Sequence, residues 1–475
     1  MATRFANRFR PLPAAVCAAL VLLGAAPQAQ MAGVWEGAIQ GPGGKLDVRL
    51  ELRLEEDGWA GTIDIPAQGA FGLPLGEVVV DSPRLRFAIA GVPGDPSFDG
   101  ELFDDGIAGT FTQRGQRLPF HLHRTTGEAR SRPQDPAGEV PYRREEVRFA
   151  ADGVELAGTL TLPEGDGPFP AVVLVSGSGA QDRDGEIMGH RPFLVLADHL
   201  TRRGIAVLRT DDRGVGGSQG NLAAATSSDL AGDALAAVHY LRQRPEVAWR
   251  RIGLLGHSEG ALVAPLAASR SSDVRFLILL AAPGVPGRQL LPLQTREIAL
   301  ATGAPEGTVE RQVALLEEGL DLVVSGAPDE EVRRGLFEVA RRQLELAGGR
   351  PGDAVTDATL SQEVELMLTP WFRFFLTYDP RQALRRIDVP VLALQGELDL
   401  QVDPDQNLPQ VSAALAQAGD EDVTIRRLPG LNHLFQTAVT GAPSEYFQIE
   451  ETLAPEVLDL VTSWILERYG GPVAG

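Results

Sequence analysis

Residues 251–269 read RIGLLGHSEGALVAPLAAS, and this stretch decides the fold. The short apolar run from Ile252 to Leu255 predicts a buried strand, and the Ala- and Leu-rich run after Gly260 predicts a helix. A Gly-x-Ser-x-Gly turn with Ser258 at its centre lies between them. The flanking glycines permit so tight a turn, which leaves the serine exposed at the start of the helix. The motif alone is a weak signal, but its strand–turn–helix setting predicts a serine nucleophile.

Strands and helices alternate on both sides of this turn. Upstream, the continuous apolar run from Pro170 to Val175 predicts a strand that is covered on both faces. The alternation stops at Pro283 and resumes near Val389, and residues 284 to about 386 carry helical periods with almost no strand candidates. The pattern predicts an α/β fold, with a mostly parallel sheet and helices on both faces. A helical cap is expected over the strands' carboxyl ends, where open sheets bind ligands.

The chain before this region has a different texture. From Met31 to about Arg124, short runs such as Val48 to Leu54 alternate apolar and polar side chains, as in a strand with one buried face. Six or more such strands predict a small antiparallel barrel or sandwich, and Gly33 to Gly37 resembles the opening strand of lipocalin-like barrels. Residues 125–142 hold three prolines and two glycines and predict a linker. The α/β domain is therefore expected at 143–475.

The first thirty residues predict a secretory signal peptide. Three arginines precede an apolar run from Ala14 to Ala26, which is too short to span a bilayer, since about 20 residues are needed. An uncleaved N-terminal anchor is the alternative. The only cysteine, Cys17, lies in this run, so the mature chain would have neither a disulfide nor a thiol nucleophile. We expect export to the periplasm or beyond, with no stable membrane insertion after the signal is removed.

The net charge of the chain limits the kinds of molecule that it can bind. Without the signal the chain holds 40 basic and 64 acidic residues, a net charge near −24. Such a surface repels phosphate backbones and anionic lipid, which argues against nucleic acid as a partner.

A serine nucleophile needs a base to take its proton. The mature chain has seven histidines, and His433 lies in a loop after the last predicted strand, which makes it the expected base. His257 adjoins the serine, but neighbours on so tight a turn point apart. His121 and His123 share a strand face, where a metal pair stays open although no third ligand is evident.

The base in turn needs a carboxylate that holds its tautomer and stabilises the imidazolium. The predicted strand at 391–395 is followed by Asp399, the expected acid because it lies near the strand's carboxyl end. Asp403 and Glu397 remain alternatives. The order serine, aspartate, histidine along the chain is that of α/β-hydrolases.

Stabilising a tetrahedral oxyanion requires two N–H donors. One is expected from the backbone of Glu259, at the N-terminus of the helix after the serine. The other is expected from the Gly- and Ser-rich loop at 176–184, where Ser178 is the first candidate and Gly177 the second. A plain Gly/Ser turn would have the same composition.

Several motifs together resemble those of EstD-type bacterial serine carboxylesterases. They are Gly177-Ser178-Gly179 with Asp182-Arg183-Asp184, Asp212 to Ser218, Gly256 to Gly260, Pro370 to Pro380, and Gly396 to Val402. The resemblance runs from about Arg143 to the C-terminus. It implies cleavage of a small-molecule carboxylic ester, with short or medium acyl groups, through an acyl-enzyme and without a cofactor. The family usually has histidine where this chain has Ser176, which would loosen the loop.

The cap should influence which acyl groups fit. Apolar bulk gathers at 371–376, and we expect Trp371 and Phe375 to wall the substrate pocket, unless they only anchor the cap on the core. Peptidase, thioesterase or lipase activity would use the same catalytic groups. An idle hydrolase core beside a ligand-binding barrel is the alternative from a different class.

Overall fold

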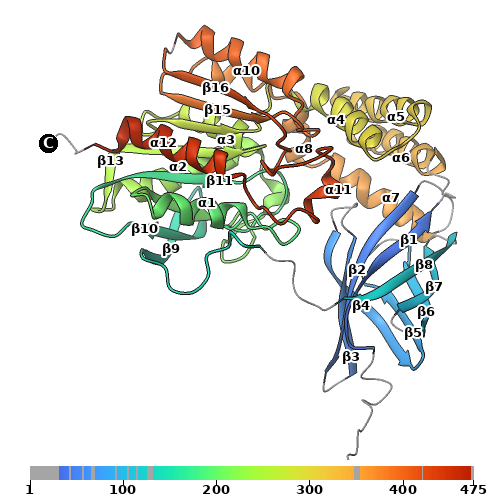
Figure 1. The fold of residues 1–475 in the computed structure, drawn as a ribbon. Coiled ribbons are helices and arrows are strands. Elements are labelled where there is room, and N and C mark those ends of the chain that lie inside the picture. The colour runs from blue at the N-terminus through green and yellow to red at the C-terminus, as the bar shows by residue number, and fades with distance from the viewer. Residues whose placement is uncertain are drawn as a thin grey trace, which may run out of the picture.

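The computed structural model describes residues 31–471, apart from 42–43, 56–57, 66–69, 91, 93, 104–105, 114–115, 126–131, 347–353 and 420. The predicted signal peptide, residues 1–30, lies outside this range. A closed β-barrel comes first in the chain, and a mixed sheet with helices on both faces follows (Figure 1). The predicted fold class is confirmed.

The N-terminal unit is a barrel of eight antiparallel strands, each paired with the next and β8 paired back to β1. The strands are β1 (Gly33–Gly41), β2 (Gly44–Glu55), β3 (Gly58–Ile65), β4 (Ala70–Asp81), β5 (Arg84–Ile89), β6 (Ser97–Phe103), β7 (Gly106–Gln113) and β8 (Gln116–Thr125). Alternate side chains point inward and fill the interior, among them the fully buried Trp35 and Leu50. The ring of Phe98 stacks on that of Phe87 at 4.7 Å. A packed apolar interior therefore holds the barrel together.

The second unit is built on an eight-stranded sheet in the order β16-β15-β14-β13-β11-β12-β10-β9. The strands are β9 (Arg143–Ala151), β10 (Val154–Leu162), β11 (Phe169–Val175), β12 (Ala206–Thr210), β13 (Val247–His257), β14 (Leu277–Leu280), β15 (Val391–Gly396) and β16 (Val423–Leu428). β11 to β16 pair in parallel, whereas β9 and β10 are antiparallel. Both outer strands carry exposed charged side chains, including Arg144 on β9 and Arg427 on β16.

Helices cover both faces of this sheet. Helices α1 (Pro192–Thr201) and α12 (Pro455–Tyr469) pack on one face, where Phe276 and Trp464 belong to the same apolar core. Helices α2 (Ser227–Arg242), α3 (Gly260–Ala268) and α10 (Pro404–Ala418) pack on the other face, around Leu254 and Val263. The short helices are η2 (Leu222–Ala224), α9 (Arg381–Leu384) and α11 (Pro443–Tyr446). The carboxyl ends of the parallel strands are left for the loops that build the site.

Five helices longer than seven residues follow one another between β14 and β15 in the described part of the chain, ahead of the short α9, and the sequence predicts a cap there. They are α4 (Gly287–Ala301), α5 (Glu306–Val324), α6 (Asp329–Leu346), α7 (Ala354–Met367) and α8 (Pro370–Thr377). They share an apolar core of their own that includes Leu320, Leu336 and Leu376. None of the described helices is long and apolar enough to cross a bilayer.

The described part of the predicted linker, residues 132–142, packs along the α/β unit and is here termed the docking segment. Arg132 donates to the backbone oxygens of Ile449 (2.5 Å) and Met188 (2.9 Å). Gln134 donates to Leu453 O at 2.6 Å and accepts two backbone N–H groups, one of them from the same leucine. These side chains satisfy backbone groups of loops that run without a strand partner, so this stretch is no free tether.

Candidate active site

Ser258 stands on a sharp turn between β13 and α3. Its φ is +56°, a left-handed conformation, and its N–H donates to Leu280 O on the neighbouring strand at 2.9 Å. A Cβ on Gly256 would come within 2.0 Å of Gly260 O, and one on Gly260 would come within 2.1 Å of Val175 O. Only glycine fits on either side, and the strained turn holds the serine above the sheet.

Asp399 and His433 meet at the carboxyl end of β15. The carboxylate is 1% exposed, and the ring Nδ1 of His433 lies 3.0 and 2.9 Å from its two oxygens. The N–H groups of Gln401 and Val402 donate to Oδ1 at 2.9 Å, and the Gln395 side chain donates to Oδ2 at 2.8 Å. Three further donors therefore fix a buried carboxylate that accepts the Nδ1–H of the imidazole and leaves Nε2 free to act as base.

The two alternative acids lie in other environments. Asp403 is the N-cap of α10 and accepts the Gln406 N–H at 2.6 Å, while burial raises the pKa of Asp403. Glu397 accepts the Gly430 N–H at 3.2 Å on an exposed turn. The structure therefore brings Asp399, and neither of these two, to the imidazole.

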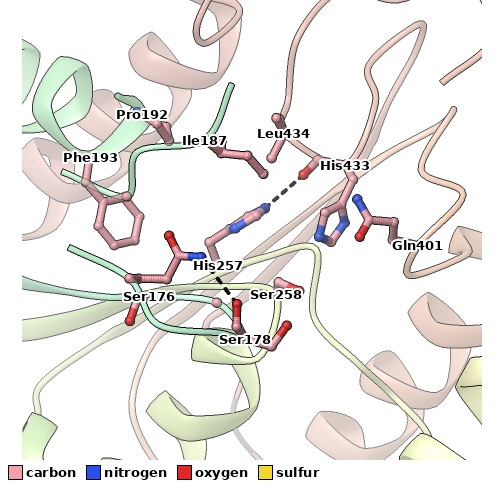
Figure 2. Close-up of a pocket in the computed structure, with 13 residues that line it drawn as sticks. Ser176, Ser178, Ile187, Pro192, Phe193, His257, Ser258, Gln401, His433 and Leu434 are labelled. Atoms are coloured by element: carbon pink, nitrogen blue, oxygen red, sulfur yellow. Dashed lines mark hydrogen bonds between the residues drawn. The ribbon is translucent and has the colours of Figure 1, made fainter. Parts of the chain in front are cut away.

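Ser258 and His433 line one cavity of about 110 Å³, together with Gln401, Leu434 and residues of the 176–193 region (Figure 2). Among the described residues no hydrogen bond joins the serine hydroxyl to the imidazole. Such contacts are often long without substrate and tighten when it binds.

His257 has a part in this arrangement that the sequence reasoning missed. Its Nε2 donates to His433 O at 2.8 Å, and the two rings lie 4.8 Å apart (Figure 2). Burial lowers the pKa of His257 to about 4, so the ring stays neutral. His257 is therefore no base, but it fixes the loop that carries the base. Its place beside the serine in the motif could have drawn attention to His257. The contact itself joins residues 176 positions apart in the sequence.

The expected oxyanion donors lie beside the serine. A Cβ on Gly177 would come within 3.4 Å of the Ser258 Cβ, so the 176–184 loop passes close to the nucleophile. Glu259 is the residue before α3, with its N–H at the helix N-terminus. Among the described residues neither this N–H nor that of Ser178 donates to another protein group. Both remain available to a substrate oxygen.

Ser176 does not loosen this loop. Its hydroxyl donates to Asp212 at 2.7 Å, and the Gln181 N–H donates to the other oxygen of that carboxylate at 2.9 Å. Burial raises the pKa of Asp212 to about 7. One carboxylate after β12 thus holds both ends of the turn that carries Ser178.

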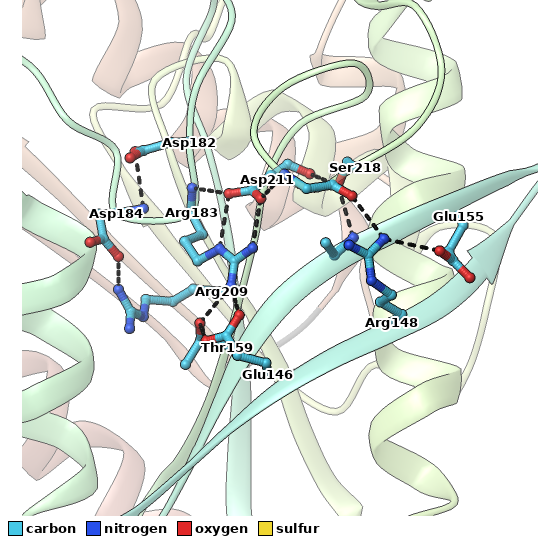
Figure 3. A network of polar contacts seen from close by, with 12 residues as sticks. Glu146, Arg148, Glu155, Thr159, Asp182, Arg183, Asp184, Arg209, Asp211 and Ser218 are labelled. Carbon is cyan, nitrogen blue, oxygen red and sulfur yellow. Dashed lines mark hydrogen bonds and ion pairs between the residues drawn. The ribbon is translucent and has the colours of Figure 1, made fainter.

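Arg183 secures the far end of the same loop (Figure 3). Its guanidinium donates to both oxygens of the buried Asp211, at 3.0 and 2.7 Å, and to Thr159 at 2.8 Å, and it also pairs with Glu146. Asp211 further accepts the Gly217 N–H at 2.8 Å. This bidentate pair ties the loop to β10 and to the end of β12.

Arg213 pairs with Asp233 of α2 at 2.5 and 2.7 Å and so ties the loop after β12 to that helix. No group of three or more His, Cys, Asp or Glu side chains in the described part of the chain is arranged to hold a metal ion.

Comparison with known proteins finds similarity to serine hydrolases and esterases. A family model described as "Serine aminopeptidase, S33" matches residues 190–314. The chain is 28% identical over 368 residues to esterase EstD of Thermotoga maritima, a match that covers 76% of this chain and 74% of EstD. Esterase FrsA of Escherichia fergusonii is 31% identical over 135 residues, 28% of this chain and 30% of FrsA. The chain is similar to these esterases, and its fold is that of an α/β-hydrolase. The predicted resemblance to EstD is confirmed.

Among solved structures, an esterase of Pyrococcus furiosus aligns with this hydrolase at 16% identity and a TM-score of 0.43, over 72% of this chain and 99% of the other. The family model covers Ser258 and Glu259 of the hydrolase and ends before Asp399 and His433. The assignment of acid and base therefore rests on the contacts described above.

A larger cavity of about 620 Å³ is lined by Glu259, the residue after Ser258. It is mainly apolar, and it is lined by Ser178, Gly179, Ala180, Leu222, Ala223, Leu230, Glu259, Leu366, Met367, Thr369, Trp371 and Phe372. Of the two aromatic residues expected to wall a pocket, Trp371 lines this cavity. Phe375 does not; it stacks behind Trp371 at 5.5 Å, since side chains four apart lie on one face of α8. The ring of Phe372, one residue after Trp371, takes the place that was expected for Phe375.

Proposed function

We propose that the protein is a serine carboxylesterase that forms an acyl-enzyme on Ser258. The observation that carries the proposal is the single cavity shared by Ser258 and His433, with Asp399 hydrogen-bonded behind the imidazole. Similarity to two esterases, EstD and FrsA, supports the same activity.

In the proposed reaction, the Ser258 hydroxyl attacks the ester carbonyl while His433 Nε2 takes its proton. The Asp399 carboxylate holds the Nδ1–H and stabilises the imidazolium. The N–H groups of Glu259 and Ser178 stabilise the tetrahedral oxyanion. As the intermediate collapses, the imidazolium protonates the leaving alcohol. Water then attacks the acyl-enzyme by the same route, and the carboxylic acid is released.

Because His433 protonates the leaving alcohol in this reaction, the two cavities hold different parts of the ester. The imidazole must reach the leaving oxygen, so the alcohol lies in the smaller cavity that His433 lines. The acyl chain then extends to the other side of the serine, into the apolar cavity beside Glu259 and Trp371. A volume of about 620 Å³ suits a short or medium acyl group.

We also propose that the mature enzyme works outside the cytoplasm. The arginines and the short apolar run of residues 1–30 support this assignment. An export assay with the native N-terminus and with its arginines replaced tests it.

A panel of esters, thioesters and aminoacyl amides tests the activity, together with labelling by a fluorophosphonate probe. The wild type should hydrolyse esters best and should be labelled on Ser258. Ser258→Ala and His433→Ala should each remove nearly all turnover, and the double variant should lose little more, because the residues act as a unit. A preference for aminoacyl amides would make the enzyme a peptidase. Absence of both labelling and turnover would favour the idle binding protein.

A further inference from the structure

The side chain of Glu259 stands between the nucleophile and the cap. Its backbone N–H is an expected donor of the oxyanion hole, whereas its carboxyl group makes other contacts. The residue is only 3% exposed, and it lines the apolar cavity assigned above to the acyl chain. The inference drawn from this carboxyl group concerns the substrate. It rests on the proposed esterase function.

Both hydrogen bonds of this carboxyl group are made by one oxygen. Oε1 accepts the Ser227 hydroxyl at 2.6 Å and the Trp371 indole N–H at 2.7 Å. An indole N–H can only donate, so Oε1 has to be an acceptor. Among the described residues no hydrogen bond uses Oε2. One oxygen thus links α2 to α8 of the cap, and the other remains unused.

The cavity that Glu259 lines offers few hydrogen-bonding groups. The cavity offers mostly aliphatic and aromatic side chains, among them Leu230, Leu366 and Phe372. Burial raises the pKa of Glu259, because keeping a charge in this place costs free energy. Asp212 lies close enough to add to the negative potential. A hydrogen-bond donor on a bound ligand would offset this cost, whereas an anionic group would increase it.

We propose that the acyl cavity selects acyl groups that carry a hydrogen-bond donor, a hydroxyl or an amine, which bonds to Glu259 Oε2. A single oxygen, Oε1, suffices to link the elbow to the cap. This structural role does not explain why a second carboxylate oxygen is placed at an apolar cavity. The donor would also anchor the far end of the acyl chain and hold the ester carbonyl at Ser258.

The test compares matched para-nitrophenyl esters with the mature wild-type protein at mildly alkaline pH. Hexanoyl, heptanoyl and octanoyl esters are each made with a terminal methyl, hydroxyl, amino or methoxy group. At one chain length the hydroxyl or amino ester should exceed its methyl counterpart in kcat/KM by about 10- to 100-fold, the usual range for a hydrogen bond to a charged group. The methoxy ester accepts but cannot donate, and it should gain nothing. A larger effect for the amine than for the hydroxyl identifies a cationic substrate.

Glu259→Gln reverses the expected preference. Because the Trp371 N–H needs an acceptor, the amide oxygen must take the place of Oε1, and the NH₂ group then occupies the position of Oε2. The ratio of hydroxyl to methoxy ester should fall by at least tenfold. Trp371→Phe is the matched control: it keeps a ring in the wall but loses the N–H, and it should keep the donor preference.

Equal kcat/KM for the methyl and donor-bearing esters of the wild type at every length would overturn this inference alone. The same ratio in the wild type and in Glu259→Gln would also overturn it. If the wild type cleaves none of these esters through Ser258, the proposed function itself fails. The wild-type comparison decides even if the Gln variant does not fold.

Discussion

Removing the side chain of Arg132 should weaken the catalytic loop from a distance. This arginine sits in the docking segment and joins two loops of the hydrolase, through the oxygens of Met188 on one side and Ile449 on the other. The second loop leads into α12, where the Ala454 N–H donates to Phe435 O, two residues after His433. Arg132→Ala breaks this connection in the full-length protein.

The structure sets the size of the effect. Two of the arginine's hydrogen bonds, at 2.5 and 2.9 Å, are well formed, and the bonds to Phe447 O and Gly189 O are both 3.4 Å long and should count for little. Because water can replace part of what is lost, we expect a destabilisation of about 2–3 kcal/mol. At about 2.1 cal/mol/K of unfolding entropy per residue, an α/β unit of about 330 residues should then lose about 3–4 °C in Tm.

Thermal denaturation followed by circular dichroism measures this fall, and hydrolysis of a soluble ester gives kcat and KM. kcat should fall several-fold because His433 is less well held, while KM should change little. Arg144→Ala removes an exposed arginine of β9 and serves as the control. If Arg132→Ala melts within a degree of that control and keeps its kcat, the docking segment does not stabilise the site. A chain that starts at residue 143 should then be as stable as one that starts at 132.

The site gives three more predictions. Asp399→Asn should lower kcat by about 10⁴-fold, whereas Asp403→Asn should cost no more than about 1 kcal/mol at the N-cap of α10; equal losses in kcat would refute the choice of acid. Burial raises the pKa of Asp212 from 3.8 to about 7, so the stability that this group contributes is fully present below about pH 4 and is lost as the pH rises through about 7. Between about pH 5 and 8 the Tm of Asp212→Asn should therefore rise relative to that of the wild type. A difference in Tm that does not change with pH would contradict this. Trp371→Ala should shift the preferred acyl length, at about 1–3 kcal/mol per methylene, while Phe375→Ala should mainly lower Tm; an acetyl-to-decanoyl ester profile that is unchanged in Trp371→Ala would argue against a pocket wall.

The parts of the site that could be predicted depend on local chain geometry. The elbow needs only a strand, a tight turn and a helix, all contained in residues 252–268, so its sequence suffices. Asp399 was predicted from its place after a strand, because parallel strands end at the same edge of a sheet. The helical insertion was predicted for a similar reason, since it interrupts a strand–helix alternation that is visible along the chain.

What could not be predicted depends on contacts between distant residues. The role of His257 requires the backbone of His433, which lies 176 residues away in the sequence. Residues 132–142 have the composition of a linker. Arg132 has its role only because backbone oxygens of the facing loops accept its hydrogen bonds. Phe375 and Phe372 are equivalent in hydropathy, and the direction in which α8 faces the cavity separates them.

The closed barrel also bears on how the protein behaves at high concentration. Unpaired strand edges are where folded chains join into larger aggregates, and a closed barrel offers none along its length. The open sheet has two such edges, and the exposed arginines on β9 and β16 make them poor templates for another strand. Opening the barrel between any two of its strands would expose new edges. Aggregation of this protein on heating through the barrel should therefore require that the barrel first opens.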